Sequence, residues 1–256
     1  MPTDKKTIES YGHYADTWAA RLRSKNNFSH PYLEKPAMYK KIPPLKGKRV
    51  LCVGCGTGEE CDYIHSLGVK EVVGIDISKS LIAYAQKSYP SLDFRVMDME
   101  KMNFPVNSFD FVYSSLALHY VKNWSKTLTN VYKILKPGGL FLFSTHHPVK
   151  WGAAVKRGKR EDSFLMGYIT NKEKDTARVY GDYFTIRKIN DTWFGDFKVS
   201  YYHKPLGSVV KEILDAGFTI SDFIEPKPQT GMKKKKRRAW EAHQKIPMFM
   251  IFELKK

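Results

Sequence analysis

The chain alternates short apolar runs with longer stretches of helical periodicity between Lys48 and Glu225. Short apolar runs bounded by turn residues are typical of strands that are buried on both faces of a parallel sheet. Such runs predict strands near residues 48–53, 70–75, 92–97, 107–113, 139–145, 218–224 and 248–252. Apolar residues spaced three and four apart predict helices near residues 58–67, 78–88, 123–135 and 208–216. The pattern therefore predicts an α/β fold with helices on both faces of a mostly parallel sheet.

Two segments depart from this alternation. Residues 4–23 carry apolar side chains at helical spacing and predict one amphipathic helix before the first strand. Residues 147–205 form a connection that is far longer than the usual link between two elements. This segment is rich in aromatic residues, and its stretches 180–189 and 192–202 have the character of extended chain. We expect a small antiparallel subdomain over the carboxyl edge of the sheet, where ligands bind in such folds.

The first predicted strand ends in a glycine-rich turn, and the second ends in a carboxylate. Gly54 and Gly56 let the backbone approach a ligand closely, and Asp76 at the tip of the next strand can accept both hydroxyls of a ribose. A dinucleotide fingerprint would place its third glycine at position 59, where this chain has Glu59. A carboxylate there repels a pyrophosphate at the helix N-terminus. The turn therefore predicts an adenosine ligand without phosphates.

Further segments follow in the order that is typical of one enzyme family. They are Asp76, Met97-Asp98-Met99, Ser108-Phe109-Asp110-Phe111-Val112, Leu118-His119-Tyr120, Leu135-Lys136-Pro137-Gly138-Gly139 and Ala216-Gly217-Phe218. With these segments the chain resembles the class I S-adenosylmethionine-dependent methyltransferases over nearly its whole length. It is similar to the small-molecule methyltransferases that carry a long insertion after the fifth strand.

The resemblance implies a fold, a domain organisation and a cofactor. The fold would be a Rossmann-like seven-stranded, mostly parallel sheet with an antiparallel last strand. Residues 1–256 would form a single methyltransferase domain, with an N-terminal helical cap at residues 1–25. The insertion at residues 147–205 would form the lid on the acceptor side. The cofactor would be S-adenosyl-L-methionine.

The resemblance also implies the residues that bind the cofactor. They are the turn residues Gly54, Cys55, Gly56 and Thr57, the ribose contacts Asp76 and Ile77, the adenine contacts Asp98 and Met99, the methionine-end contacts Ser114 and Ser115, and Tyr14 of the first helix. Core packing is the alternative role for Tyr14 and for its neighbour Tyr11. One position departs from the family pattern, because an acid commonly ends the first strand and this chain has Cys52. That acid helps to hold the amino group of the cofactor, so Glu59 or Glu60 would have to replace it.

Methyl transfer from a sulfonium requires alignment and a dry site, and it requires a base only where the acceptor must lose a proton. The candidate bases are His119 after the fourth strand and the pair His146 and His147 after the fifth. Histidine suits this role because its unperturbed pKa is ~6.5. Alternation along the strand sends one member of the pair inward and the other toward solvent. His203 and Glu225 are further alternatives.

The net charge of +17 is unusual, and the run Lys233–Arg238 supplies a large part of it. An excess of positive charge favours an anionic partner, although such a run is more often a solvated loop.

The three cysteines, Cys52, Cys55 and Cys61, are interpreted as small buried thiols, so we expect neither a metal nor a disulfide. No apolar run approaches the ~20 residues that span a bilayer, and the N-terminus is polar. We therefore expect a cytoplasmic protein without membrane contact.

Three functions fit these patterns. The first is a methyltransferase whose acceptor is a small molecule, aromatic or anionic, and the long aromatic insertion favours it. The second is an RNA-modifying methyltransferase, which the positive charge favours. The third is a protein that binds S-adenosylmethionine without catalysis, for which Cys52 is the specific indication.

Overall fold

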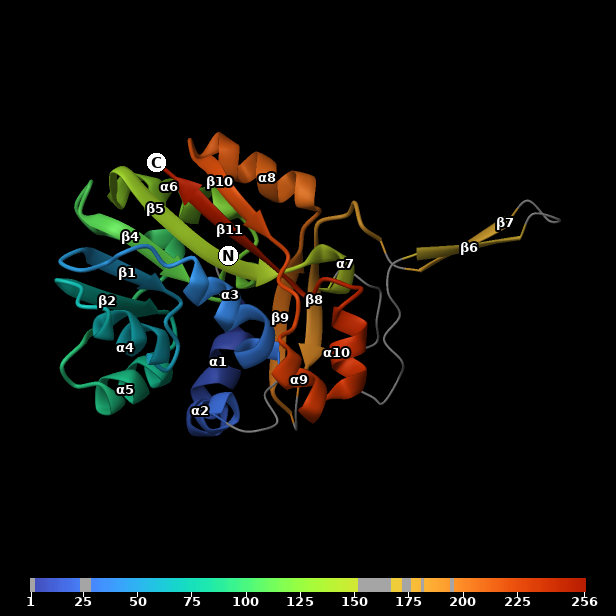
Figure 1. The fold of residues 1–256 in the computed structure, drawn as a ribbon, viewed down its shortest axis with the longest axis horizontal. Helices are drawn as coiled ribbons and strands as arrows, with labels where there is room; N and C mark the ends of the chain where they lie inside the picture. Colours follow the sequence, from blue (N-terminus) through green and yellow to red (C-terminus); the bar gives the residue numbers. More distant parts are fainter. Residues whose placement is uncertain (1–2, 24–28, 152–166, 172–175, 181, 194–195) are drawn as a thin grey trace.

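The computed structural model describes residues 3–23, 29–151, 167–171, 176–180, 182–193 and 196–256. Within these ranges, seven strands form one sheet in the order β10-β11-β5-β4-β1-β2-β3 (Figure 1). Their bounds are β1 Arg49–Val53, β2 Glu71–Asp76, β3 Asp93–Val96, β4 Phe109–Ser114, β5 Leu135–His146, β10 Thr219–Ile224 and β11 Phe249–Lys255. The predicted strands are confirmed to within a few residues, and β5 begins earlier than expected.

The directions of the strands are those of the predicted fold. β1 is parallel to β2 and β4, β2 is parallel to β3, and β4 is parallel to β5. β11 is antiparallel to both of its neighbours, β5 and β10. The Rossmann-like sheet with an antiparallel last strand is therefore confirmed. The strand order reverses between β1 and β4, and the carboxyl ends of strands at such a point open a crevice for a ligand.

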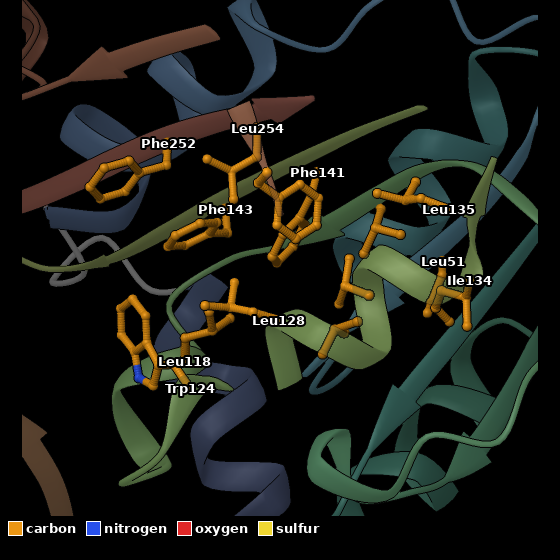
Figure 2. Close-up of a cluster of buried hydrophobic side chains, with 14 of the residues drawn as sticks. Leu51, Leu118, Trp124, Leu128, Ile134, Leu135, Phe141, Phe143, Phe252 and Leu254 are labelled. Carbon is orange, nitrogen blue, oxygen red and sulfur yellow. The ribbon is translucent and has the colours of Figure 1, made fainter. Parts of the chain in front are cut away.

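Helices cover both faces of the sheet. Their bounds are α3 Lys35–Lys40, α4 Glu59–Ser66, α5 Lys79–Ser88, α6 Trp124–Ile134 and α8 Leu206–Asp215. On the face under α6 and α8, Leu128 lies in one buried cluster with Leu51 and Phe143 (Figure 2). On the other face, Ile64 of α4 lies in a second cluster with Val50, because successive residues of a strand point to opposite faces. None of the helices in the described ranges is long and apolar enough to cross a bilayer.

The N-terminal segment differs from the prediction. Residues 4–23 form two helices rather than one, because the chain leaves helical geometry at Tyr14, where φ is −104° and ψ is 20°. Gly12 weakens the last turn before this break, since glycine loses more conformational entropy in a helix than other residues do. The elements of this segment are α1 Lys5–His13, α2 Ala15–Arg23 and the π-helix η1 His30–Glu34.

Within the insertion, the structure describes one short helix and two antiparallel hairpins. Their bounds are α7 Pro148–Trp151, β6 Gly167–Asn171, β7 Thr176–Tyr180, β8 Arg187–Thr192 and β9 Lys198–His203. The β6–β7 hairpin projects away from the sheet, whereas β9 packs against α1 (Figure 1). Extended chain was expected from residue 180, but residues 183–185 form bends before β8 begins. Residues 152–166 of the predicted lid lie outside the described residues.

The basic run Lys233–Arg238 is helical, which corrects its interpretation as a loop. It contributes to two short helices, α9 Thr230–Lys235 and α10 Arg237–His243. The Nζ of Lys233 lies 5.0 Å from the centre of the Trp240 ring, so one helix contacts the other through a cation–π pair. The positive charges nevertheless remain on the surface of the protein, where lysine and arginine side chains are exposed.

We predict that Leu128→Ala lowers the free energy of unfolding by about 2–5 kcal/mol, because it removes a fully buried side chain and leaves a cavity. Urea denaturation measures this change. The matched control is Leu214→Ala on α8, where the leucine is 54% exposed, and a change within about 0.5 kcal/mol is expected there. Similar losses in both variants would contradict the assignment of the core.

Candidate functional site

A cavity of about 560 Å³ opens at the carboxyl ends of β1 to β4. The sheet contributes the turn after β1, Asp76 at the end of β2 and Asp98 after β3. The opposite walls come from the N-terminal elements and the insertion, for example through Tyr11 and Trp193. Segments that are far apart in the sequence therefore enclose one space at the edge of the sheet where ligands bind in open α/β folds.

The turn after β1 presents bare backbone to this cavity. Gly54 has a φ of 69° and Gly56 a φ of 54°, values that residues with a side chain rarely adopt. A Cβ on Gly54 would lie 2.4 Å from the Cβ of Ala117, so this position has no room for a side chain. A Cβ on Gly56 would meet no atom within 4 Å, and this glycine lines the cavity. The open space over Gly56 allows a ligand to approach the main chain.

Asp76 joins the tip of β2 to this turn. Its Oδ2 accepts a hydrogen bond from the Gly56 N–H at 3.0 Å, and its Oδ1 accepts one from the Ser78 N–H at 2.9 Å. Ser78 supplies the cap of α5, because its Oγ accepts a hydrogen bond from the Leu81 N–H. Burial raises the pKa of Asp76, and the backbone N–H groups of Ser78, Gly56 and Ile77 act against this rise. Each carboxylate oxygen can accept a further hydrogen bond, so both hydroxyls of a ribose find acceptors here.

The tip of β3 forms the neighbouring part of the cavity. Asp98 accepts a hydrogen bond from the Glu100 N–H at 2.9 Å and thereby caps the short 3₁₀ helix η2, Met99–Lys101. Met97 and Met99 line the cavity on either side of Asp98. Thioether side chains adapt to flat aromatic rings. This end of the cavity therefore combines a carboxylate with two side chains that can cover a planar base.

The cysteines contribute no metal site. Cys52, Cys55 and Cys61 are buried and free. Burial raises the pKa of Cys55, so this thiol in the turn stays protonated. Among the described residues, no group of three histidine, cysteine, aspartate or glutamate side chains is placed to hold a metal ion.

Comparisons with known proteins agree with this geometry. Residues 51–143 match the family model of a methyltransferase domain. The chain is similar to an S-adenosylmethionine-dependent methyltransferase from Mesorhizobium loti, and the comparison with its crystal structure gives a TM-score of 0.70. The two sequences are 28% identical, and the match covers 86% of this chain and 96% of that chain. The chain belongs to the class I S-adenosylmethionine-dependent methyltransferases. Its cofactor is accordingly S-adenosylmethionine.

Two curated relatives of this methyltransferase differ in how much of the chain they match. An uncharacterized protein of Haemophilus influenzae is 28% identical over 80% of this chain and 81% of its own length. A ubiquinone biosynthesis O-methyltransferase of Bradyrhizobium is 32% identical over 56% of this chain. The chain spans 62% of that enzyme, which is less than two thirds of its length.

Most of the site residues expected in the methyltransferase line the cavity. They are Gly54, Cys55, Gly56, Thr57, Asp76, Ile77, Asp98, Met99, Ser115, His119 and His146. The two carboxylates expected at the nucleoside, Asp76 and Asp98, thus share one cavity with two of the three histidines expected on the acceptor side. The sheet edge brings them together because every one of these residues lies at the carboxyl end of a strand or follows it.

Three expected site residues, Tyr14, Ser114 and His147, are not among the lining residues. The Tyr14 hydroxyl donates to Asp196. Ser114 is buried in the sheet, where its Oγ donates to the Val53 carbonyl at 2.8 Å. Alternation along the strand therefore leaves Ser115, rather than Ser114, facing the cavity.

His147 points away from the cavity, as alternation predicts for one member of the pair. Its Nε2 lies 2.8 Å from Oε1 of Glu225, and its Nδ1 accepts a hydrogen bond from the Val149 N–H at 3.2 Å. Burial lowers the pKa of His147, although the nearby Glu225 carboxylate acts in the other direction. The expectation that this ring faces solvent is wrong, because the side chain is buried against the end of β10.

The other two histidines form a stack of aromatic rings with Trp151. The ring centres of His119 and His146 are 3.5 Å apart, and those of His146 and Trp151 are 3.9 Å apart, with nearly parallel planes. Both ring nitrogens of His119 are buried, and neither has a hydrogen-bond partner among the described residues. Burial lowers the pKa of His119 to about 3, so its ring is neutral at neutral pH. In this arrangement His119 acts as part of a flat wall rather than as a strong base.

Sequence reasoning named Tyr11 as a candidate cofactor contact, but it did not assign Trp18, Tyr120 or His30 to the site. Trp18 of α2 stacks on Trp193 of the insertion with ring centres 5.7 Å apart, and both line the cavity. The Tyr11 and Tyr120 hydroxyls, 2.6 Å apart, join α1 to the segment after β4. The helical spacing of residues 4–23 marks Tyr11 and Trp18 as inward-facing, but the sequence does not reveal that the insertion supplies the opposite ring. His30, discussed below, lies in a segment without periodicity.

The charge of the cavity contrasts with that of the whole chain. Its lining includes the carboxylates of Glu59, Glu60, Asp76, Asp98 and Asp191. No lysine or arginine occurs among the described lining residues, although the chain has a net charge of +17. A lining of this kind favours cationic or neutral ligands over anionic ones.

We predict that His119→Phe flattens the dependence of the unfolding free energy on pH between 6.5 and 3. His119 has its ordinary pKa of 6.5 in the unfolded chain and about 3 in the folded chain, so the unfolded chain binds the proton over this interval. Above pH 6.5 the His119 ring is neutral in both states and does not change the free energy of unfolding. As the pH falls from 6.5 toward 3, the free energy of unfolding decreases by up to about 1.4 kcal/mol per pH unit. Urea unfolding at a series of pH values measures the slope.

The control for this experiment is His65→Gln, because His65 is exposed. Its pH dependence should match that of the original chain. An unchanged slope in His119→Phe would contradict the buried, neutral ring.

Proposed function

We propose that this methyltransferase transfers the methyl group of S-adenosylmethionine to a small-molecule acceptor by in-line displacement. The observation that carries the proposal is the single cavity, which joins the glycine turn and Asp76 on one side to the aromatic residues of the insertion on the other. Cofactor and acceptor would meet within this cavity. Alignment of the reacting atoms and exclusion of water are the main contributions that a protein makes to such a transfer.

On this proposal, the residues at the strand tips hold the cofactor. Asp76 would accept hydrogen bonds from the ribose hydroxyls, Asp98 would accept one from the adenine amino group, and Met97 and Met99 would cover the adenine ring. The bound cofactor supplies an activated methyl group on a positively charged sulfur. The carboxylates of the lining favour that positive charge.

The acceptor would lie between the histidine stack and the insertion. Residues 147–205 would serve as the lid of this side, and α1 and α2 as the helical cap, within a single domain of residues 1–256. The rings of His119, His146 and Trp151 form a flat apolar wall that suits a planar acceptor. No lysine or arginine of the described lining supports the anionic alternative, so we propose an aromatic acceptor that is neutral or cationic.

The comparisons favour a small acceptor over a macromolecular one. The Bradyrhizobium relative is named as an O-methyltransferase of ubiquinone biosynthesis, and ubiquinone is a small molecule. The basic run favours RNA, but Arg237 pairs with Glu241 at 2.8 Å and Lys233 lies over Trp240. These two charges therefore have partners within the protein.

Among the described residues of the proposed acceptor site, His119 is not a strong general base. The low pKa of His119 and the burial of its ring nitrogens leave it unsuited to remove a proton at neutral pH. The proposed transfer therefore depends on alignment, and the acceptor atom is one that attacks with its own lone pair. His146 would contribute to the wall of the site in the same way.

We predict that Asp76→Ala weakens binding of S-adenosylhomocysteine, the demethylated cofactor, by about ten- to hundredfold, because two hydrogen bonds to a charged group are lost. Isothermal titration calorimetry measures the affinity. Asp62→Asn, at an exposed acid on α4, is the control and should bind as the original chain does. Equal affinity in Asp76→Ala would contradict the proposed ribose site.

The acceptor class is tested with a cofactor that carries a labelled methyl group. The proposal predicts a labelled product of low mass when the enzyme is incubated with a metabolite extract, and mass spectrometry detects it. Label in added RNA instead would favour the RNA-modifying alternative. Cofactor binding without any labelled product across neutral, cationic and anionic acceptors would favour a non-catalytic role.

A further inference from the structure

A buried carboxylate ties the N-terminal segment to the sheet beside the glycine turn. Glu34, at the end of η1, has no exposed surface. Its Oε1 accepts hydrogen bonds from Ser115 Oγ at 2.9 Å and from Ser144 Oγ at 2.6 Å. Ser115 follows β4 and Ser144 lies in β5, so one side chain fixes η1 against the carboxyl ends of two adjacent strands. Burying a charge in this way is costly unless it is paired.

The partner of this charge is His30, which lines the cavity. Its Nε2 lies 3.1 Å from Oε2 of Glu34 and 3.7 Å from Oε1 of Glu60. The same nitrogen is 3.3 Å from Ser115 Oγ. Burial alone would lower the pKa of His30, but the two carboxylates outweigh it and raise the pKa, which favours a protonated ring. The cavity therefore has a positive charge at this end.

A negative charge lies beside it. Glu60, in the first turn of α4, also lines the cavity, and Lys35 Nζ lies 2.8 Å from its Oε1. Burial would raise the pKa of Glu60, but His30 and Lys35 lower it overall and keep the carboxylate charged. Among the described lining residues, His30 and Glu60 thus form a pair of opposite charges close to the turn after β1 and to Ser115 after β4.

Cys52, which lines the same cavity, stands at the position where the family resemblance leads us to expect an acid. Its side chain is 1% exposed and lies in the apolar cluster with Cys61 and Ile64. This residue supplies no carboxylate to the cavity. The acid that this chain lacks at the end of β1 is therefore available from the first turn of the following helix.

We propose that His30 and Glu60 together recognise the amino-acid end of the cofactor, His30 binding its carboxylate and Glu60 its ammonium group in place of the usual acid after β1. This inference rests on the cofactor assignment above. The amino-acid end is a zwitterion, and a cavity end with one cation and one anion complements both of its charges. Glu34 and Lys35 act as positioning residues, because each holds one member of the pair without lining the cavity.

The test compares two ligands that differ in the amino-acid end alone. S-adenosylhomocysteine carries it, whereas 5′-methylthioadenosine has the same nucleoside and sulfur without the amino acid. Calorimetric titration of His30→Gln and Glu60→Gln should show an affinity for S-adenosylhomocysteine that is about ten- to hundredfold weaker, because a hydrogen bond to a charged group is lost. The affinity for 5′-methylthioadenosine should stay unchanged, which also shows that the variant is folded.

The matched control is Asp62→Asn, which changes an exposed carboxylate of the same helix, α4. Asp62 does not line the cavity, so the ratio of the two affinities should stay as in the original chain. Equal weakening of both ligands in His30→Gln and Glu60→Gln, or no weakening of either, would overturn the inference. Failure of the original chain to bind either nucleoside would instead contradict the cofactor assignment.

Discussion

The hydrogen bond from the Gly56 N–H to the Asp76 carboxylate is the interaction on which the site depends. It joins the turn after β1 to the tip of β2 and orients a carboxylate toward the space that the bare glycine leaves open. The sheet makes this possible because parallel pairing of β1 and β2 brings both strand ends to one edge. The proposed ribose site thus follows from the pairing register of the two strands. A ligand with a pyrophosphate would meet Glu59 and Glu60 where it needs the positive end of a helix.

Closure of the site comes from elements outside the sheet. Glu34 holds η1 against β4 and β5, and the Trp18–Trp193 stack holds α2 against the insertion. These two contacts differ in kind, since one is a buried network of charges and hydroxyls and the other is aromatic packing. Together these contacts add walls to the crevice at the edge of the sheet. Such walls limit the access of water, which methyl transfer requires.

The sheet, its topology and the strand-tip residues that line the cavity were predictable from the sequence. Apolar runs, the glycine turn and Asp76 are local patterns, and each is compatible with few backbone structures. The remainder depends on tertiary contacts that no local pattern encodes. Glu34 and His30 lie in a polar segment, and their importance arises from Ser115 and Ser144 of distant strands. Alternation explains why Ser115 rather than Ser114 faces the cavity, and this position could therefore have been predicted from the sequence. The burial of both nitrogens of His119 depends on three-dimensional packing, and a motif cannot reveal it.

A crystal structure of the protein with S-adenosylhomocysteine tests the central claim most directly. The account predicts that both ribose hydroxyls lie within about 2.6–3.2 Å of the Asp76 carboxylate oxygens, with the sulfur over the glycine turn and facing the histidine stack. A nucleoside bound elsewhere, or a turn that closes over Gly56 and leaves no room for the ribose, would contradict it.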